Sequence, residues 1–314
     1  MSRIHEALKK AEQERANVQA ATADAAFPAE TSPVAVPSAE TWSSRTPEIS
    51  ADPATAAATD SIYPSGDFLR FDDLRKRCAH PTWHLDASVN VFFNPTLSVH
   101  GAEQFRTLRS RLYQLRANQP LRKLLVTSAV PSEGKTFVTS NLAQAIVRQP
   151  DRRVLIIDAD LRCARLHLPL GAPTSPGLTD YLRGEADEMA VIQHGEEGNL
   201  CFIAGGNEVT DPSELLSNGR LKKLLDRLTP VFDWVILDSP PCVPVADASI
   251  LANLCDGVLL VVRAGSTPSE VAERARQELQ GKNVVGVVLN AVDESGIHGS
   301  TYYQAYGYGY GTQA

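Results

Sequence analysis

The stretch Ala129-Val-Pro-Ser-Glu-Gly-Lys-Thr136 decides the fold of this chain, because its order of small, basic and hydroxyl residues is that of a phosphate-binding loop. An apolar run, Leu121 to Val126, leads into it like a buried strand, and residues 136–148 leave it with helical spacing. In such a strand–loop–helix unit, backbone N–H groups of the loop and of the helix N-terminus face phosphate oxygens. We therefore predict that the chain binds a nucleotide.

Two side chains of the loop have distinct expected roles. Lys135 is expected to neutralise the β- and γ-phosphates, and the Thr136 hydroxyl to bind Mg²⁺. Ala129 stands where the pattern G-x-x-x-x-G-K-[ST] has its first Gly. The remaining positions expected to contact the nucleotide are Val130, Pro131, Ser132, Glu133, Gly134 and Phe137, together with Ala129.

The composition allows one large domain plus tails, or two small domains. Of the 314 residues, 43% are hydrophobic, which is enough for a sizeable core. The net charge of −7 argues against general nucleic-acid binding, which usually shows a basic surface. No apolar run approaches the roughly 20 residues that cross a bilayer. The segment Met1–Glu6 lacks the apolar core of a signal peptide.

The five cysteines are odd in number and scattered, without a Cys-x-x-Cys pair. Disulfide frameworks and zinc sites have different, paired spacing. We therefore expect reduced thiols, mostly packing residues of a cytoplasmic protein. They are Cys78, Cys163, Cys201, Cys242 and Cys255.

The patterning predicts five regions. Residues 1–16 have apolar side chains at helical spacing and predict a short amphipathic helix, which is marginal alone and needs a partner surface. Residues 17–66 are rich in Ala, Pro, Ser and Thr and predict a disordered linker. A lead-in segment at 67–100 precedes the nucleotide-binding domain at 101–295, and a Gly/Tyr tail forms 296–314.

From Leu121 onward, apolar strand-like runs alternate with helical patterns such as Ser213–Leu228 and Ser269–Leu279. Several runs are apolar throughout, as in parallel strands that helices cover on both faces. The predicted fold is α/β, a P-loop NTPase-type, mostly parallel sheet with ligands at the carboxyl ends of its strands. The expected strands are Leu124–Thr127, Val154–Ile157, Leu200–Ala204, Val235–Leu237, Gly257–Val262 and Val284–Leu289.

Three carboxylates come directly after two of these strands. Asp158 and Asp160 follow 154–157, and Asp238 follows 235–237. A lone strand-end Asp is more often a helix cap, but three of them in a chain with a P-loop favour a Mg²⁺–phosphate site. All three are predicted to serve the metal, and either Asp158 or Asp160 to act as the base toward an acceptor hydroxyl.

Two polar residues at other strand ends leave alternatives open. Asn290 follows the run 284–289, where its amide either hydrogen-bonds the edge of adenine or forms a turn. Arg263, after the run 257–262, is similarly open. We include Asn290 in the predicted nucleotide site.

These motifs resemble the bacterial protein-tyrosine kinases (BY-kinases) of polysaccharide synthesis, whose Walker A, A′ and B sites lie on a P-loop ATPase core. The resemblance covers the chain from about Val99 to its C-terminus, and Ser2–Ala11 is similar to the exopolysaccharide chain-length tyrosine autokinase branch. The family often continues the A′ motif with Arg-Pro, where this chain has Cys163-Ala-Arg165, a change in the loop after the acids. The motifs that carry the resemblance are Ala129–Thr136 with Pro131, Asp158-Ala-Asp160-Leu-Arg162, Asp238-Ser-Pro-Pro241, Gly177-Leu-Thr-Asp-Tyr-Leu-Arg-Gly184 and Asp211-Pro-Ser-Glu-Leu-Leu216.

The C-terminal tail carries five of the eight tyrosines of the chain within nine residues. Interleaved glycines keep such a segment unfolded, and composition alone also fits an aromatic low-complexity tail. The resemblance implies that the tail is autophosphorylated in trans, with ATP and Mg²⁺ as cofactors. The expected sites are Tyr302, Tyr303, Tyr306, Tyr308 and Tyr310.

Glu103, Arg106 and Arg109 lie at i, i+3 and i+6 on one flank of a predicted helix. Such a charged row is usually a solvated face. The resemblance implies that it contacts the adjacent subunit of a homo-oligomeric ring, in which the tail of one subunit enters the site of the next. Phosphorylated tails would repel one another and loosen that ring.

The alternative is a partitioning-type P-loop ATPase switch without kinase activity, which shares the fold. Those ATPases carry an extra Lys near the start of the loop, and the corresponding residue here is Val130, whose side chain has no charge to offer a phosphate. Their membrane-binding members tend to end in a basic amphipathic helix, whereas this chain ends in Gly and Tyr. A scaffold that binds ATP only to assemble is the non-catalytic alternative.

The resemblance also implies the split arrangement, in which a separate membrane-spanning protein activates the kinase and the pair controls the chain length or export of a polysaccharide. The chain would then be cytoplasmic and peripheral to the inner membrane through that partner. Residues 1–16, on their long linker, are the predicted tether.

Overall fold

The computed structural model describes residues 69–94, 98–195 and 198–292. The predicted helix at 1–16, the linker at 17–66 and the tail at 296–314 with its five tyrosines lie outside the described residues. Within the described ranges, no helix combines the length and apolar composition that a membrane span requires.

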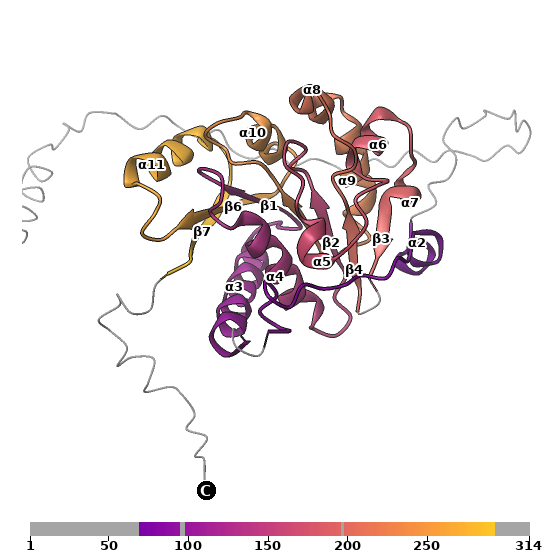
Figure 1. The fold of residues 1–314 in the computed structure, drawn as a ribbon, viewed down its shortest axis with the longest axis horizontal. Helices are drawn as coiled ribbons and strands as arrows, with labels where there is room; N and C mark the ends of the chain where they lie inside the picture. The colour runs from indigo at the N-terminus through magenta and orange to yellow at the C-terminus, as the bar shows by residue number, and fades with distance from the viewer. Residues whose placement is uncertain (1–68, 95–97, 196–197, 293–314) are drawn as a thin grey trace, which may run out of the picture. The chain divides into compact units, whose positions relative to one another are not determined.

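A sheet of seven strands forms the centre of the described part, in the order β3-β4-β2-β5-β1-β6-β7 (Figure 1). Neighbouring strands are parallel except β3, which runs antiparallel to β4. In this order β1 lies between β5 and β6, so the loop after β1 opens at the middle of the sheet. The strands are β1 (Lys123–Ser128), β2 (Val154–Asp158), β3 (Ile192–His194), β4 (Leu200–Ile203), β5 (Trp234–Asp238), β6 (Gly257–Arg263) and β7 (Val284–Asn290).

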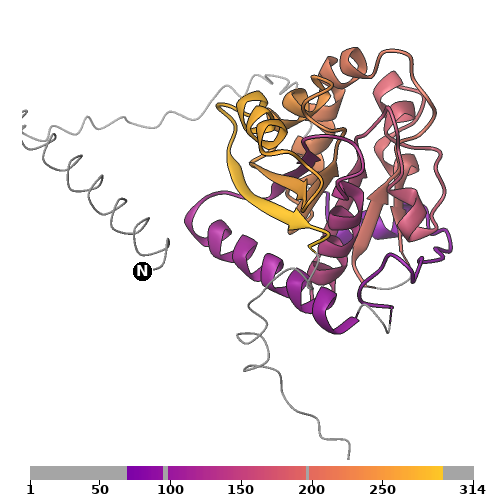
Figure 2. The ribbon, with the colours of Figure 1, turned by 60° about the vertical axis from the view of Figure 1, so that its left-hand side comes forward.

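Helices cover both faces of the sheet: β2 and β5 are apolar up to a terminal Asp, and every one of their residues is buried. In Figure 2 the purple α3 and the orange α11 lie on opposite sides of the yellow strand β7. One core cluster holds side chains of α3 (Ser98–Asn118), α4 (Lys135–Val147) and α5 (His167–Leu170). The other holds side chains of α2 (Phe71–Arg77), α6 (Leu178–Arg183), α7 (Glu188–Val191), α8 (Pro212–Ser217), α9 (Arg220–Leu228), α10 (Asp247–Ala252) and α11 (Ser269–Glu278).

The predicted α/β fold is confirmed, with each of the six expected strands present to within a residue at either end. Strand β3 was not predicted, since three residues are too few to show a period. The single helix predicted at Ser213–Leu228 is wrong: Gly219, with φ +80°, separates α8 from α9. A residue in the left-handed region does not continue a right-handed helix, so the chain turns there.

The segment before α3 is held by hydrogen bonds to the edge strand β3 and to helix α4. Ala79 forms a parallel bridge with Gln193 of β3. Farther along, the side chain of Asn141 in α4 accepts a hydrogen bond from the N–H of Val91 and donates one to the carbonyl of Val89, each at 2.9 Å. The helix that follows the P-loop therefore also holds the residues that lead into α3.

The cysteines are all free, as expected. Cys78, Cys201 and Cys242 are buried, and burial raises the pKa of each thiol, which keeps it protonated and unreactive. Cys255 is half-buried and Cys163 is exposed.

Candidate active site

The P-loop, residues 129–134, connects β1 to α4 (Figure 1). Gly134 has φ +93° and Ser132 has φ +67°, whereas Ala129 is not among the residues with positive φ. Ala129 is fully buried and packs in the core cluster with Leu125. Because its backbone does not need the conformational freedom of Gly, the departure at this position is tolerated, while Gly134 is required.

Two residues at the ends of β6 and β7 bind the P-loop backbone. Asn290 donates from its side-chain amide to the carbonyl of Glu133 at 2.8 Å. Arg263 donates from Nη1 to the carbonyl of Ser132 at 3.2 Å. The structure therefore places Asn290 beside the loop, as predicted for the nucleotide site, with its amide donor engaged by protein. Contact with adenine stays a prediction.

Replacing Gly134 by Ala is expected to destabilise the fold and to weaken nucleotide binding. A Cβ at Gly134 overlaps the amide nitrogen of Asn290, so the amide has to give up the carbonyl of Glu133. The lost hydrogen bond and the left-handed backbone together amount to about 2–3 kcal/mol. Chemical denaturation of the variant measures this loss directly.

The matched control is Gly219→Ala, at φ +80° with nothing within 4 Å of the added Cβ. This control carries the backbone strain without the overlap, so it is expected to lose only about 1–2 kcal/mol. Equal losses in the two variants would show that Asn290 moves aside freely and that its bond to the loop contributes nothing.

Three buried carboxylates meet at the mouth of the loop. Because β2 and β5 are neighbours, Asp158 and Asp238 are register partners at their carboxyl ends. Asp160 follows two residues after Asp158. The exposed fraction is 0% for Asp158, 1% for Asp238 and 3% for Asp160. The structure thus brings together the acids that the sequence singled out.

Lys135 and Thr136, the first residues of α4, face these acids. The ammonium Nζ of Lys135 lies 3.0 Å from Oδ2 of Asp160. The Thr136 hydroxyl donates to Oδ2 of Asp238 at 2.6 Å, and the hydroxyl of Thr139, one turn along α4, donates to Oδ1 at 3.3 Å. All five residues predicted for phosphate, metal and base chemistry therefore lie in one polar cluster. Thr139 also belongs to this cluster, and the sequence did not predict it.

Burial raises the pKa of Asp238 to about 6, with Asp160 adding to the rise against the opposing effects of Lys135 and the two threonine hydroxyls. Burial and the neighbouring Asp238 also raise the pKa of Asp158 well above its usual value. For Lys135, desolvation disfavours the charged form, but Asp238 and Asp160 outweigh it and raise the pKa. Within the described part of the chain, the ammonium of Lys135 is therefore the one cation that opposes three closely spaced carboxyl groups, and this arrangement favours the binding of a second cation.

The oxygen donors fit Mg²⁺. Within the described ranges, no three acidic, His or Cys side chains are grouped as a complete metal site. Mg²⁺ is usually held by one or two carboxylates together with substrate phosphates and water, so a complete protein cage is not needed. Thr136 and Asp238, with Asp158 beside them, supply such a partial set of hard oxygen ligands.

Arg162 holds the segment after Asp160 in place, a role that the sequence did not reveal. Its guanidinium binds both carboxylate oxygens of Asp247 in α10, at 2.7 and 3.1 Å. It also donates to the hydroxyl of Ser213 in α8 at 3.1 Å, and that hydroxyl donates to Asp247. Asp247 is fully buried, but no local pattern marks it, since its partner is 85 residues away.

The residues predicted for subunit contact lie on α3. Glu103 and Arg106 form an exposed ion pair, whereas Arg109 donates from Nη1 to the carbonyl of Ala145 in α4 at 2.5 Å. Phe137, predicted to contact nucleotide, packs its ring 5.8 Å from that of Phe105 of α3. Arg109 and Phe137 thus both take part in joining α3 to α4.

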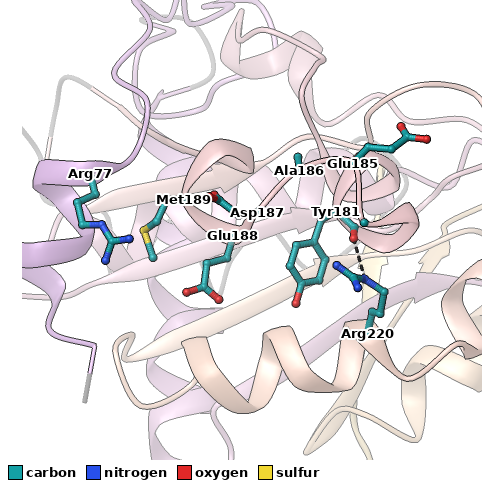
Figure 3. A pocket seen from close by; sticks show the side chains of 9 residues that line it. Arg77, Tyr181, Glu185, Ala186, Asp187, Glu188, Met189 and Arg220 are labelled. Atoms are coloured by element: carbon teal, nitrogen blue, oxygen red, sulfur yellow. Dashed lines mark hydrogen bonds between the residues drawn. The ribbon is translucent and has the colours of Figure 1, made fainter. Parts of the chain in front are cut away.

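A surface cavity of about 530 Å³ lies away from the P-loop, among α2, α6, α7 and α9 (Figure 3). Two of its charged side chains already have partners: Arg220 donates to the carbonyl of Tyr181 at 2.9 Å, and Glu188 lies 2.6 Å from Arg227. We assign the chemistry to the cluster at the P-loop.

The comparisons with known proteins agree with this geometry. Residues 124–306 match the family model "CobQ/CobB/MinD/ParA nucleotide binding domain". Tyrosine-protein kinase YwqD of Bacillus subtilis (strain 168) is 34% identical over 214 residues, which are 68% of this chain and 87% of YwqD. The chain belongs to the family of bacterial tyrosine-protein kinases.

Other bacterial tyrosine-protein kinases are longer. Tyrosine-protein kinase etk of Escherichia coli (strain K12) is 38% identical over 225 residues, which are 70% of this chain but 31% of etk. The solved kinase domain of Escherichia coli tyrosine kinase ETK has a TM-score of 0.63 at 34% identity, covering 76% of this chain and 91% of that domain. The chain spans about a quarter of the length of another relative, tyrosine-protein kinase ptk of Acinetobacter johnsonii (26%).

Proposed function

We propose that the chain is an ATP- and Mg²⁺-dependent protein-tyrosine kinase that phosphorylates its own C-terminal tyrosine cluster in trans. The observation that carries the proposal is the convergence of Lys135, Thr136, Asp158, Asp160 and Asp238 at the mouth of the P-loop, in a chain of the tyrosine-protein kinase family. The absence of a basic side chain at Val130 argues against the partitioning-type ATPase.

Each residue has a defined task in this proposal. The N–H groups of the P-loop and the ammonium of Lys135 bind the β- and γ-phosphates, while Thr136 and Asp238 hold Mg²⁺ with Asp158. Mg²⁺, when bound, neutralises charge that develops on the phosphate oxygens. The buried walls of the cluster exclude water from the transfer.

Asp160 is our choice as the base. Lys135 contacts Oδ2 of Asp160 in this structure and has to exchange that carboxylate for phosphate oxygens. The exchange frees Oδ2 to accept the proton of a tyrosine hydroxyl. Both oxygens of Asp158, in contrast, accept backbone N–H groups, from Asp160 at 3.3 Å and from Leu166 at 2.8 Å.

The proposal also covers the assembly of subunits, the location in the cell and the biological role. The exposed Glu103–Arg106 pair, with Arg109 beside it, contacts the adjacent subunit of a ring, and the tail of one subunit enters the site of the next. Several phosphotyrosines add roughly 1.5–2 negative charges each and loosen the ring. The chain is cytoplasmic, held at the inner membrane by a separate membrane-spanning activator through residues 1–16, and it controls polysaccharide synthesis, chain length or export.

The test is incubation of the purified full chain with γ-labelled ATP and Mg²⁺, followed by mapping of the label. We expect label on Tyr302–Tyr310. Transfer in trans is checked by mixing inactive Lys135→Met chain, whose tail is intact, with active chain in which the five tail tyrosines are Phe. Label on the Lys135→Met chain shows that one molecule phosphorylates another.

The other outcomes distinguish the alternatives. Release of inorganic phosphate without label on protein indicates the ATPase switch. Neither release nor label indicates a scaffold. Label that appears only within active chains that keep their tyrosines overturns transfer in trans.

A further inference from the structure

Glu133 places a buried carboxylate inside the loop that is expected to bind phosphates. The residue is 2% exposed. Its Oε2 accepts the N–H of Val130 at 2.7 Å, while Oε1 accepts the Thr267 hydroxyl at 2.5 Å and the N–H of Arg263 at 3.2 Å. None of the ion pairs in the described part of the chain includes Glu133, so neutral donors alone satisfy this carboxylate.

These three bonds join the loop to itself, to the last residue of β6 and to the connection between β6 and α11. The bond to Val130 closes the loop from within. Those to Arg263 and Thr267 tie it to a segment about 130 residues later. Bonds between a carboxylate and N–H or O–H groups are charge-assisted, hence stronger than those between neutral groups. Their combined effect is to restrict the loop to one conformation.

The loop conformation needs such support. Ser132, immediately before Glu133, has φ +67°, which is unfavourable for a residue with a side chain, and Gly134 follows at φ +93°. Arg263 donates to the carbonyl of Ser132, and Asn290 donates to that of Glu133. At the start of the loop, the N–H of Val130 is bound by the carboxylate of Glu133.

We propose that Glu133 is a positioning residue of the P-loop, whose carboxylate holds the loop in its phosphate-binding conformation before a nucleotide arrives. The inference rests on the nucleotide binding in the proposed function and adds a residue that acts through the loop, without touching phosphate.

The direction in which one substitution changes nucleotide affinity distinguishes this positioning role from a purely electrostatic effect. Glu133→Gln removes a negative charge from a loop that binds polyanionic phosphate. If charge alone mattered, the variant would bind nucleotide more tightly. If Glu133 positions the loop, binding weakens, because the amide NH₂ of Gln faces N–H or O–H donors and at least one bond is lost.

The experiment is a titration of a fluorescent ADP analogue with Mg²⁺ into the full chain, with the thermal unfolding midpoint measured for each variant. Glu133→Gln is expected to raise Kd about tenfold. Thr267→Val removes one donor and is expected to raise Kd about threefold, whereas Thr267→Ser, which keeps the hydroxyl, restores the wild-type value. In the kinase assay KM for ATP rises by the same factors while kcat changes less.

Asp256→Asn is the matched control, since Asp256 accepts the N–H groups of Arg122 and Lys123 at the opposite end of β1. It is expected to lower the unfolding midpoint without changing Kd. Unchanged or tighter binding by Glu133→Gln overturns the inference, and if that variant does not fold, unchanged Kd in Thr267→Val does so. A wild-type chain that binds no nucleotide contradicts the proposed function instead.

Discussion

Replacing Lys135 by Met is expected to lower the rate of phosphate transfer about 10³-fold. The ammonium lies 3.0 Å from Asp160 at the mouth of the loop, and its side chain is 15% exposed. It is the cation that the structure places where β- and γ-phosphates are expected. Without it, three buried carboxylates also face an incoming polyanion unopposed, so nucleotide affinity falls together with the rate.

Lys123→Met is the matched control for this prediction. Lys123 begins β1, pairs with Asp256 at 3.4 Å and has a side chain that is 21% exposed, so it resembles Lys135 in burial and pairing. It lies at the opposite end of the strand from the P-loop. Tail labelling should persist in Lys123→Met and vanish in Lys135→Met, with circular dichroism showing both folded. Labelling of Lys135→Met at a third of the wild-type rate would remove Lys135 from the phosphate site.

Replacing Asp238 by Asn is expected to stabilise the nucleotide-free protein near neutral pH while lowering kinase activity about 10²–10³-fold. The activity is lost because the amide is a poor ligand for Mg²⁺. Stability rises because burial makes the charged carboxylate unfavourable, as its pKa of about 6 shows. The hydroxyls of Thr136 and Thr139, which donate to Asp238, are able to rotate and accept from the new NH₂ group.

The stability gain depends on pH. A carboxyl whose pKa is raised in the folded state stabilises the fold at low pH, and this contribution is lost as pH rises from about 4 toward 6. The difference between Asp238→Asn and wild type is therefore small near pH 4 and reaches a plateau above pH 6.5, at about 3 kcal/mol or about 6–12 °C in Tm. Thermal unfolding without nucleotide, measured at each pH, checks the profile.

The comparison has to be made variant against wild type at the same pH. His194 is buried, and its pKa is lowered to about 4. Its contribution therefore increases stability as pH rises from about 4, whereas that of Asp238 decreases it. Because His194 is present in both proteins, its contribution cancels when the stability of wild type is subtracted from that of the variant. Asp180→Asn serves as the contrast, because both oxygens of Asp180 accept N–H groups, from the backbone of Gly177 at 2.7 Å and from the side-chain amide of Asn207 at 2.8 Å, whereas an Asn side chain has only one acceptor oxygen. This variant is expected to destabilise the nucleotide-free protein. A destabilised Asp238→Asn at pH 7.5 would contradict the argument.

Local pattern was sufficient for six strands and for the P-loop. The apolar runs that became β1, β2 and β5 are buried along their whole length, so hydrophobicity alone located them. It failed where the signal was short or broken, at β3 with three residues and at Gly219, which divides one helical pattern into α8 and α9. A hydrophobic period does not reveal a single residue with positive φ.

The sequence by itself determined that this chain has a phosphate-binding loop and strand-end acids, because each of these features is written within about ten consecutive residues. The tertiary structure decided how they act on one another. The order β2-β5-β1-β6-β7 places Asp158 beside Asp238 and brings Asn290 to the loop. Glu133 meets Thr267 across 134 positions and Arg162 meets Asp247 across 85. Which strands become neighbours depends on the packing of the whole sheet, so contacts at such separations have no local signature.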